Sequence, residues 1–512
     1  MTDQPRTAIH IIPTPSQVVP TSQGCVLGPG AQVLASPAVT RLAEELLSPS
    51  TGRADDMAAE AATLRFSLID EPELGDEGYR LRINGQNVSI HAQTEQGHVW
   101  ALQTLRQLAS CTAVPAGSAP RTLPGVAVTD VPRLPWRGVL VDVARWYQPL
   151  SFLLGMVDRL AMHKFNVLHL HLTDDQGWRF EVSRYPRLAE IGGFRAESSS
   201  GHLDEGRFDG TRHGGYYTQK ELRILVSYAA ARGVQVMPEL DLPGHMQAAV
   251  SAYPGLGNRP DVQLKVRAAW GISPHILNTR DTTLDFMRHV LDELVDVFPF
   301  DYIHLGGDEI PLDEWRSSTE ARQRVNDEGL NGAAALASWW ITTMGRHLQE
   351  HGRKFAAWDD QLEVGLPREA LIFAWQSAAR VGYALARGHE VVAVPEQFVY
   401  LDRAETDSPR EPTAIDGPLP LSQVYDYEPV PAGAEGRVLG SQGMLWAEYL
   451  PRPSLVDWRA FPRLTAIAER CWSGGGRKRE YMAALPHHLL RLTSMGVRYN
   501  TLAATSGERK SV

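Results

Sequence analysis

Two adjacent carboxylates, Asp308 and Glu309, end the segment His304-Leu-Gly-Gly-Asp-Glu309, which follows a β-leaning aromatic run. Gly306 and Gly307 remove side-chain bulk where this predicted strand stops, so a ligand can come close to the backbone. Carboxylates held at a strand end beside a cleft suit acid–base chemistry on a bound substrate. Alternatively, the two residues begin the next helix, where acidic side chains favour the helix dipole. The motif alone leaves both interpretations open.

Polar residues recur at the ends of the other predicted strands. We predict strands at 137–144, 166–173, 234–241, 302–309, 354–359, 370–375, 390–395 and 438–446. Polar residues at or just after their ends include Asp142, Arg145, His169, His171, Asp174, Glu239, Asp241, His245, Asp360, Asp402 and Glu448. Each alone fits a satisfied buried group or a helix cap. A set in phase with the strand ends predicts a shared cleft.

The elements between these strands indicate the fold class. Helical runs are predicted at 151–163, 220–232, 284–297, 333–351 and 455–471. Strands that alternate with helices imply an α/β fold with a parallel sheet, and eight such units imply a closed (β/α)8 TIM barrel. An open doubly wound sheet is the alternative, but no glycine-rich phosphate motif follows the first strand. Residues 196–215, rich in Ser, Gly and Asp, form an insertion after the second strand.

Residues 1–132 are predicted to form a small α+β accessory domain. It has extended runs at 9–13 and 126–129, a hairpin at 79–91 and helices at 38–47 and 98–110, but no catalytic constellation. A proline-marked linker precedes the barrel. We therefore expect an accessory domain at 1–132, a catalytic barrel at 133–480, and a C-terminal helix and tail at 481–512.

Composition excludes several classes of partner. The net charge of −10 comes without a basic stripe, so no nucleic acid is expected. No apolar run reaches the roughly 18 residues that cross a bilayer, so no membrane partner is expected. Three widely spaced cysteines form no disulfide framework and suit a reducing compartment. The N-terminus carries no recognisable export signal, so a cytoplasmic location is expected unless the true start codon lies upstream.

Aromatic residues near the strand ends suggest the ligand. Four are predicted to face the mouth of the barrel: Trp358, Trp375, Tyr400 and Trp446. Aromatic walls with a few charged groups suit a sugar ring, whose C–H faces pack on indole while its hydroxyls bind polar side chains. The hydroxyl-binding candidates are Arg145, Asp402 and Glu448. Core packing is the alternative for each tryptophan.

His169 and His171 share one face of a strand, which is a geometry that zinc sites use. Barrel interiors also hold such histidines in hydrogen-bond networks, and no third ligand with suitable spacing is evident. We therefore predict no metal and no cofactor.

Several of these segments resemble the family-20 glycoside hydrolases, the β-N-acetylhexosaminidases. The matching motifs are Arg137–Arg145, Lys164–Trp178, Pro238–His245, His304–Glu309, Trp358-Asp-Asp360, Tyr400-Leu-Asp402 and Trp446-Ala-Glu448. The resemblance covers about residues 125–475, and Ile11-Ile-Pro-Thr-Pro15 is similar to the family's accessory domain. Leu170 stands where the family often has Trp, which we expect to alter packing rather than chemistry.

The resemblance implies an exo-acting, retaining enzyme that releases terminal N-acetylglucosamine or N-acetylgalactosamine from a β-linked N-acetylhexosaminide. The substrate's own acetamido oxygen would attack the anomeric carbon and form an oxazolinium intermediate. Glu309 would be the general acid and base, Asp308 would orient the acetamido N–H, and Tyr400 would bind its oxygen. Adjacent strand residues project to opposite sides, but chemistry alone would allow the reverse assignment of the two carboxylates.

The remaining roles also follow from the resemblance. Trp358, Trp375 and Trp446 would enclose the sugar and its acetamido methyl group. Arg145, Asp402 and Glu448 would hold ring hydroxyls, and Asp174 would pair with His245 beside the acid. The family implies a monomer or a homodimer.

Three other readings of the site stay open. They are a non-catalytic sugar-binding barrel, a glycosidase that uses its own carboxylate as nucleophile, and a metal-dependent hydrolase. The sequence does not distinguish gluco- from galacto-configured substrates.

Overall fold

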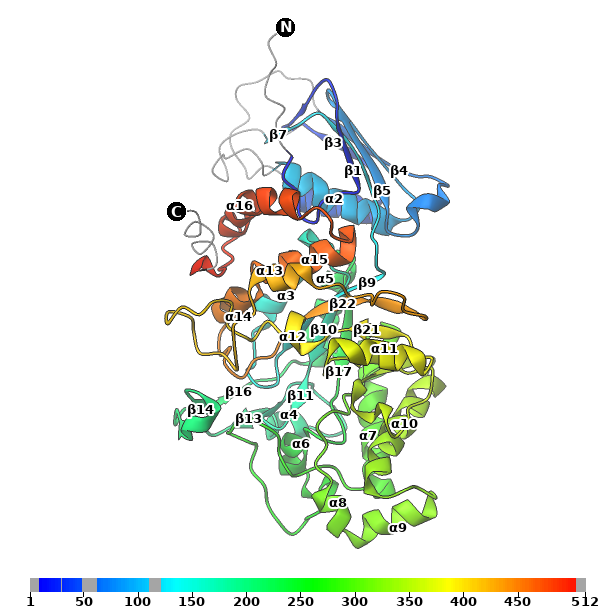
Figure 1. Ribbon diagram of the computed structural model, residues 1–512, viewed down its shortest axis with the longest axis vertical. Helices are drawn as coiled ribbons and strands as arrows, with labels where there is room; N and C mark the ends of the chain where they lie inside the picture. Colours follow the sequence, from blue (N-terminus) through cyan, green and yellow to red (C-terminus); the bar gives the residue numbers. More distant parts are fainter. Residues whose placement is uncertain (1–8, 29, 48–61, 110–120, 503–512) are drawn as a thin grey trace.

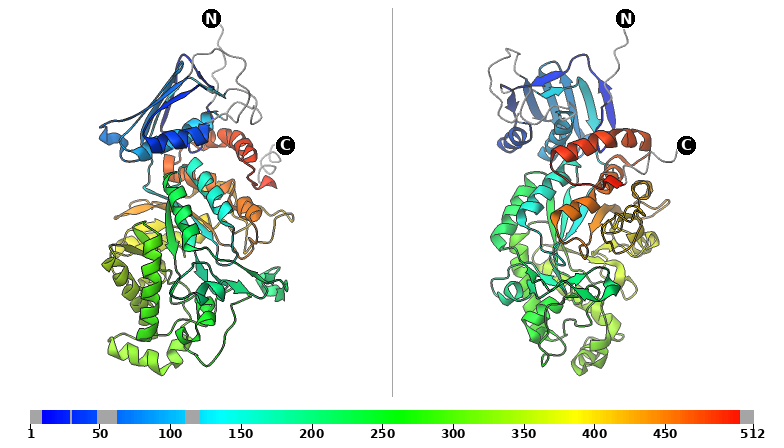
Figure 2. Two further views of the ribbon diagram at one scale, coloured as in Figure 1. Left: turned by 180° about the vertical axis from the view of Figure 1, so that it is seen from behind. Right: turned by 90° about the vertical axis from the view of Figure 1, so that its left-hand side faces the viewer.

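A computed structural model describes residues 9–28, 30–47, 62–109 and 121–502. Two bodies follow one another along the long axis of the molecule, as Figure 1 and Figure 2 show. The smaller one comes from the first part of the chain and the larger one is the barrel. The C-terminal tail beyond residue 502 and Cys111 lie outside the described residues.

The larger body is a closed parallel barrel, which confirms the predicted fold. Its strands in chain order are β9 (Trp136–Asp142), β10 (Val167–His171), β17 (Gln235–Glu239), β18 (Tyr302–His304), β19 (Lys354–Trp358), β20 (Leu371–Ala374), β21 (Val391–Ala393) and β22 (Val438–Leu445). β22 pairs with β9 and closes the ring. Most of these strands are buried along their whole length, as expected when helices cover a parallel sheet.

Helices surround the barrel. The main ones are α3 (Leu150–Met162), α5 (Gln219–Ala230), α7 (Asp281–Val297), α10 (Ala333–Glu350), α11 (Ala378–Ala386), α14 (Pro453–Ala460) and α15 (Arg463–Ser473). The single helix predicted at 455–471 is wrong, because the chain breaks at Phe461 and Pro462 between α14 and α15. Proline lacks the N–H that would continue a helix across this point. Within the described residues, none of the helices has the length and apolar character that crossing a membrane would require.

The predicted insertion at 196–215 forms short hairpin-like pairs rather than a longer element. β13 (Phe194–Arg195) pairs with β16 (His213–Gly214), and β14 (Ser199–Ser200) pairs with β15 (Arg207–Phe208). This segment extends to one side of the barrel in Figure 1.

The smaller body is a mixed sheet backed by two helices. The strands, in the order β1-β8-β5-β6-β4-β3, are Gln17–Pro20, Val126–Asp130, Tyr79–Asn84, Asn87–Ala92, Thr63–Leu68 and Gln32–Leu34. The helices are α1 (Pro37–Leu47) and α2 (Glu95–Ala109). The predicted hairpin is confirmed as β5 and β6. The run at 9–13 is not a strand, and β1 begins only at Gln17.

A buried ion pair joins the two bodies. Lys164, in the loop before β10, places Nζ 2.6 Å from Asp130 Oδ2 and 2.8 Å from the Tyr79 hydroxyl. Trp472 of α15 donates its indole N–H to the same carboxylate at 2.9 Å. Helix α16 (Lys478–Ser494) also lies between the bodies in Figure 2. Its Arg491 side chain donates to the carbonyl oxygen of His10. Because buried charges are costly unless paired, these contacts fix one body against the other.

The fourth strand is shorter than predicted. β18 ends at His304, so Asp308 and Glu309 lie in the following loop, and the prediction that they alternate on a strand is wrong. Glu309 has a φ of 48°, in the left-handed region. The alternative that these residues begin a helix is also wrong, since α8 (Asp313–Ser317) starts four residues later. A left-handed turn, rather than strand alternation, therefore separates the two carboxylates.

Gly306 makes that turn possible. Its φ is 64°, and a Cβ at this position would lie 1.8 Å from Asp241 Oδ1 and 2.7 Å from Asp241 Cα. The N–H of Gly307 donates to the same Asp241 oxygen at 3.1 Å. The β17 and β18 loops therefore approach each other more closely than any side chain at 306 would allow.

We expect Gly306→Ala to destabilise the protein by about 2–4 kcal/mol. A left-handed alanine costs about 1 kcal/mol, and the overlap with Asp241 adds about 1–3 kcal/mol. Gly329→Ala is the matched control, because Gly329 has a φ of 63° with no atom near its Cβ position. Thermal unfolding midpoints of the two variants measure the difference, and equal midpoints would show that the close approach at Asp241 is unimportant.

Candidate active site

Four aromatic side chains form a continuous aromatic wall at the strand ends: Trp358, Trp375, Tyr400 and Trp446. Trp375 stacks on Tyr400 with ring centroids 6.2 Å apart. Tyr400 lies 6.2 Å from Trp446, which lies 5.9 Å from Trp358. Trp358 is buried at the end of β19, whereas the other three are partly exposed. The structure thus brings the four predicted residues together on one surface.

The three predicted hydroxyl binders lie beside this wall. Arg145 is held above the Trp446 ring at 5.2 Å, and its Nη2 lies 3.9 Å from Glu448 Oε1. Asp402 is 5% exposed and its Oδ1 accepts no hydrogen bond from the described residues. Burial and the neighbouring Glu448 raise the pKa of Asp402 to about 7. Carboxyl oxygens with unused acceptor capacity at a partly open surface can bind ligand hydroxyls.

Asp308 and Glu309 meet at one histidine. His245 Nε2 lies 3.9 Å from Asp308 Oδ2 and 3.5 Å from Glu309 Oε2. The Glu309 side chain is 37% exposed and the Asp308 side chain 14%, so the first reaches solvent while the second lies deeper. One cation thus faces two carboxyl groups of different accessibility.

Asp308 shares its environment with a second buried carboxyl group, Asp241. Burial and the neighbouring Asp241 raise the pKa of Asp308 well above its ordinary value, and His245 opposes this shift. Burial also raises the pKa of Asp241. Two close buried carboxyl groups do not readily both ionise, so the pair retains a proton. The Oδ1 atom of Asp308 is buried and accepts no hydrogen bond from the described residues.

A chain of alternating carboxylates and imidazoles leads from His245 into the barrel. We call Glu239, His171, Asp174 and His245 the carboxylate–imidazole chain. Asp174 Oδ1 lies 3.3 Å from His245 Nδ1, and Asp174 Oδ2 lies 3.0 Å from His171 Nε2. His171 Nδ1 lies 2.6 Å from Glu239 Oε2. The predicted pairing of Asp174 with His245 is therefore present as a contact.

The charges along this chain reinforce one another. Burial lowers the pKa of His171, but Glu239 and Asp174 raise it by more, and the resulting pKa is about 10. Burial likewise opposes the charge on His245, while Asp174 and Asp241 raise its pKa well above the ordinary value. Arg145 Nη2 forms a 2.9 Å ion pair with Asp174 Oδ2 and lowers the pKa of that carboxyl group. Both imidazoles are therefore cations between carboxylates.

The structure supplies the third group that the His169 and His171 pattern lacked. Glu239 Oε2 lies 3.1 Å from His169 Nε2, and Oε1 lies 3.0 Å from His304 Nδ1. The indole N–H of Trp358 also donates to Oε1 at 2.9 Å. Because His171 also contacts Oε2, nitrogen atoms surround the Glu239 carboxylate. We interpret Glu239 and these neighbours as a polar network that anchors Trp358.

Sequence reasoning gave no role to three residues that support the site. Glu239 anchors the barrel interior, and Asp241 holds the loop beneath Asp308. Asp360 accepts from the Glu309 N–H at 3.3 Å and from the Trp375 indole at 2.7 Å. Burial raises the pKa of Asp360 to about 6. Only the position of these residues at predicted strand ends could have indicated them.

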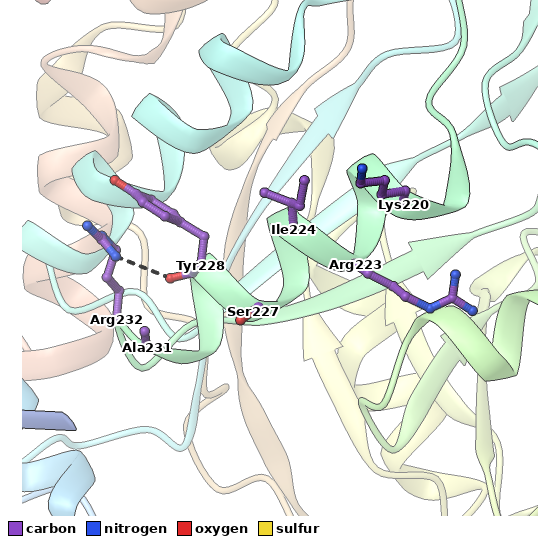
Figure 3. A pocket seen from close by; sticks show the side chains of 7 residues that line it. All are labelled: Lys220, Arg223, Ile224, Ser227, Tyr228, Ala231 and Arg232. Carbon is purple, nitrogen blue, oxygen red and sulfur yellow. Dashed lines mark hydrogen bonds between the residues drawn. The ribbon is translucent and has the colours of Figure 1, made fainter. Parts of the chain in front are cut away.

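A separate open groove lies on the outer surface of α5. Its volume is about 650 Å³, and Figure 3 shows its lining side chains: Lys220, Arg223, Ile224, Ser227, Tyr228, Ala231 and Arg232. Arg223 is paired with Asp296, and Arg232 is paired with Asp158 and Glu45. None of the predicted site residues lines this groove, and its arginines are already neutralised.

Comparisons with known proteins agree with this arrangement. The model of the glycosyl hydrolase family 20 catalytic domain matches residues 134–475, and the model of domain 2 of that family matches residues 8–131. A β-hexosaminidase of Porphyromonas gingivalis is 34% identical over 96% of this chain, and the match spans 64% of that relative's length. A β-hexosaminidase of Vibrio furnissii is 32% identical over 90% of this chain and 76% of its own.

Solved structures are similar over nearly the whole chain. The Streptomyces plicatus N-acetyl-β-hexosaminidase in complex with thio-NAglucal has a TM-score of 0.82 and 28% identity, with 97% of each chain covered. The exo-β-N-acetylglucosaminidase of Vibrio harveyi in complex with N-acetylglucosamine has a TM-score of 0.82 and 27% identity, covering 97% of this chain and 80% of that one. The barrel, the accessory domain and these matches agree: the chain belongs to glycosyl hydrolase family 20.

Proposed function

We propose that this protein is an exo-acting, retaining β-N-acetylhexosaminidase that uses the substrate's acetamido group as its nucleophile. The observation that carries the proposal is that Asp308 and Glu309 both approach His245 Nε2, at 3.9 and 3.5 Å. The sugar-bound relatives support the substrate class, because one is a complex with N-acetylglucosamine. Family 20 is also an exception to hydrolysis with two enzyme carboxylates.

The deeper carboxyl group, Asp308, orients the nucleophile. Its Oδ1, which accepts no hydrogen bond from the described residues, accepts the acetamido N–H when Asp308 is ionised. The Tyr400 hydroxyl donates to the acetamido oxygen and turns it toward the anomeric carbon. Holding the nucleophile in place replaces a bimolecular encounter with an intramolecular one. The Asp308 charge also offsets the positive charge of the oxazolinium ion.

The more exposed carboxyl group, Glu309, handles the proton. It protonates the glycosidic oxygen as the acetamido oxygen bonds to the anomeric carbon and the leaving alcohol departs. It then takes a proton from the water that attacks the same carbon and reopens the oxazolinium ring. Two inversions at one carbon give net retention. A general acid of this kind contributes about 10²–10⁴-fold to the rate.

The polar end of the site favours a terminal sugar. Arg145, Asp402 and Glu448 bind ring hydroxyls, and the aromatic wall packs against the ring and the acetamido methyl group. A further sugar attached to one of the bound ring hydroxyls would displace these contacts. This arrangement accounts for removal of one sugar from the non-reducing end, as N-acetylglucosamine or N-acetylgalactosamine.

We expect Glu309→Gln to lose about 10²–10⁴-fold in kcat/KM on a β-linked N-acetylglucosamine disaccharide, but much less on an aryl glycoside. An aryl leaving group departs without a proton from the general acid, whereas a sugar alcohol needs that proton to depart. Glu320→Gln, an exposed substitution on α9 (Thr319–Asp327), is the control and should retain wild-type rates.

Equal losses on the two substrates would exclude Glu309 as the general acid. A wild-type protein inactive on both across a range of pH would contradict the proposed activity itself.

We expect His245→Gln to move the acid limb of the kcat/KM pH profile to higher pH. The His245 cation lowers the pKa of Asp308, and Asp308 must be ionised to stabilise the oxazolinium ion. Activity is lost as pH falls through that pKa, so removing the cation shifts the loss to higher pH. His289→Gln, which alters a contact with Tyr185, is the control. Superimposable acid limbs would show that His245 does not act on Asp308.

A further inference from the structure

A second set of potential metal ligands lies far from the strand ends described above. His347 and His351 are separated by one turn at the C-terminal end of α10, and Asp292 faces them from α7. We call these three residues the α7–α10 cluster. His347 Nε2 lies 2.7 Å and His351 Nε2 lies 3.4 Å from the same oxygen, Asp292 Oδ1. The two helices run side by side along the barrel in Figure 1.

The spacing of these atoms is close to that of a zinc site. With bonds of about 2.0–2.1 Å, tetrahedral ligand atoms lie about 3.3 Å apart. The His351–Asp292 distance already has this value, and the His347–Asp292 distance requires an opening of about 0.6 Å. Asp292 is 43% exposed and lies on a helix surface, so its side chain can make this movement.

Each imidazole is oriented with its Nε2 toward the centre of the cluster. His351 Nδ1 lies 3.0 Å from the carbonyl oxygen of His347 and donates to it, which leaves Nε2 with a free lone pair. Metal-binding histidines usually donate their other ring N–H to a carbonyl or carboxylate in this way. His347 Nε2 donates to Asp292 Oδ1 at 2.7 Å, and an ion bound there takes the place of this proton, as metal binding to histidine requires.

The cluster is accessible to an ion from solvent. The side chain of His351 is 39% exposed and that of His347 is 14% exposed. A tetrahedral ion bound by these three residues would complete its shell with water. The four other groups of possible ligands among the described residues belong to the active-site network and are largely buried.

We propose that the α7–α10 cluster is a binding site for a divalent transition metal of the zinc type. Two imidazoles and one carboxylate are ligands suited to zinc, whereas magnesium and calcium require oxygen ligands. His351 lies three residues before β19, at the end of that strand opposite Trp358. The ion therefore has a structural role: it clamps α7 to α10 on the face of the barrel remote from the chemistry.

The test measures metal binding to the chelator-treated full chain. We expect equilibrium dialysis against Zn²⁺ alone to show one tight equivalent per chain, and the thermal unfolding midpoint to rise when Zn²⁺ is added. Mg²⁺ should give neither result. His351→Gln and Asp292→Asn should each weaken binding by more than about tenfold, because each removes a ligand. Hydrolytic rates should not depend on Zn²⁺.

The matched control is His275→Gln. His275 forms a comparable surface pair with Glu314 at 2.8 Å, but the described residues place no second imidazole beside it. This variant should bind Zn²⁺ as the wild-type protein does. Circular dichroism identifies any variant that fails to fold. If one of His351→Gln and Asp292→Asn does not fold, Zn²⁺ binding to the other variant tests the proposal. Absence of a tight equivalent, or its persistence in a folded cluster variant, would overturn the proposal.

Discussion

The carboxylate–imidazole chain is the interaction on which the site depends. It runs from Glu239 inside the barrel through His171 and Asp174 to His245, which faces Asp308 and Glu309. A single buried charge of this kind would be strongly unfavourable, but here each histidine lies between carboxyl groups and Asp174 lies between the two histidines. The alternation keeps both histidines protonated, so the last of them presents a fixed positive charge to the two carboxyl groups at the mouth.

The barrel makes such a chain possible because it brings distant parts of the sequence to one rim. β10 supplies His171, β17 ends at Glu239, and the loop after β18 carries Asp308 and Glu309. The close approach of Gly306 to Asp241 sets the depth of Asp308, while the left-handed turn at Glu309 leaves that side chain more exposed. One loop thus gives two adjacent carboxyl groups different surroundings and, in our proposal, different tasks.

The sequence predicted the barrel and the location of polar groups at its strand ends, because both depend on local patterns of apolar and charged residues. The family resemblance, rather than spacing, gave the individual roles. Strand alternation failed for Asp308 and Glu309, since a left-handed turn follows His304. The contacts of Glu239 with His169 and His304, and of Asp360 with Glu309, join residues far apart in the chain. No local pattern encodes such contacts, which only tertiary packing determines.

The most direct measurement is kcat/KM for aryl β-glycosides whose 2-acetamido group carries progressively more fluorine. Fluorine withdraws electrons from the carbonyl oxygen and weakens it as a nucleophile, but leaves the leaving group unchanged. If that oxygen attacks the anomeric carbon while Asp308 and Tyr400 hold it, kcat/KM falls steeply with each fluorine added. If the rates are insensitive to fluorination, the acetamido group is not the nucleophile and the mechanism proposed for this site is incorrect.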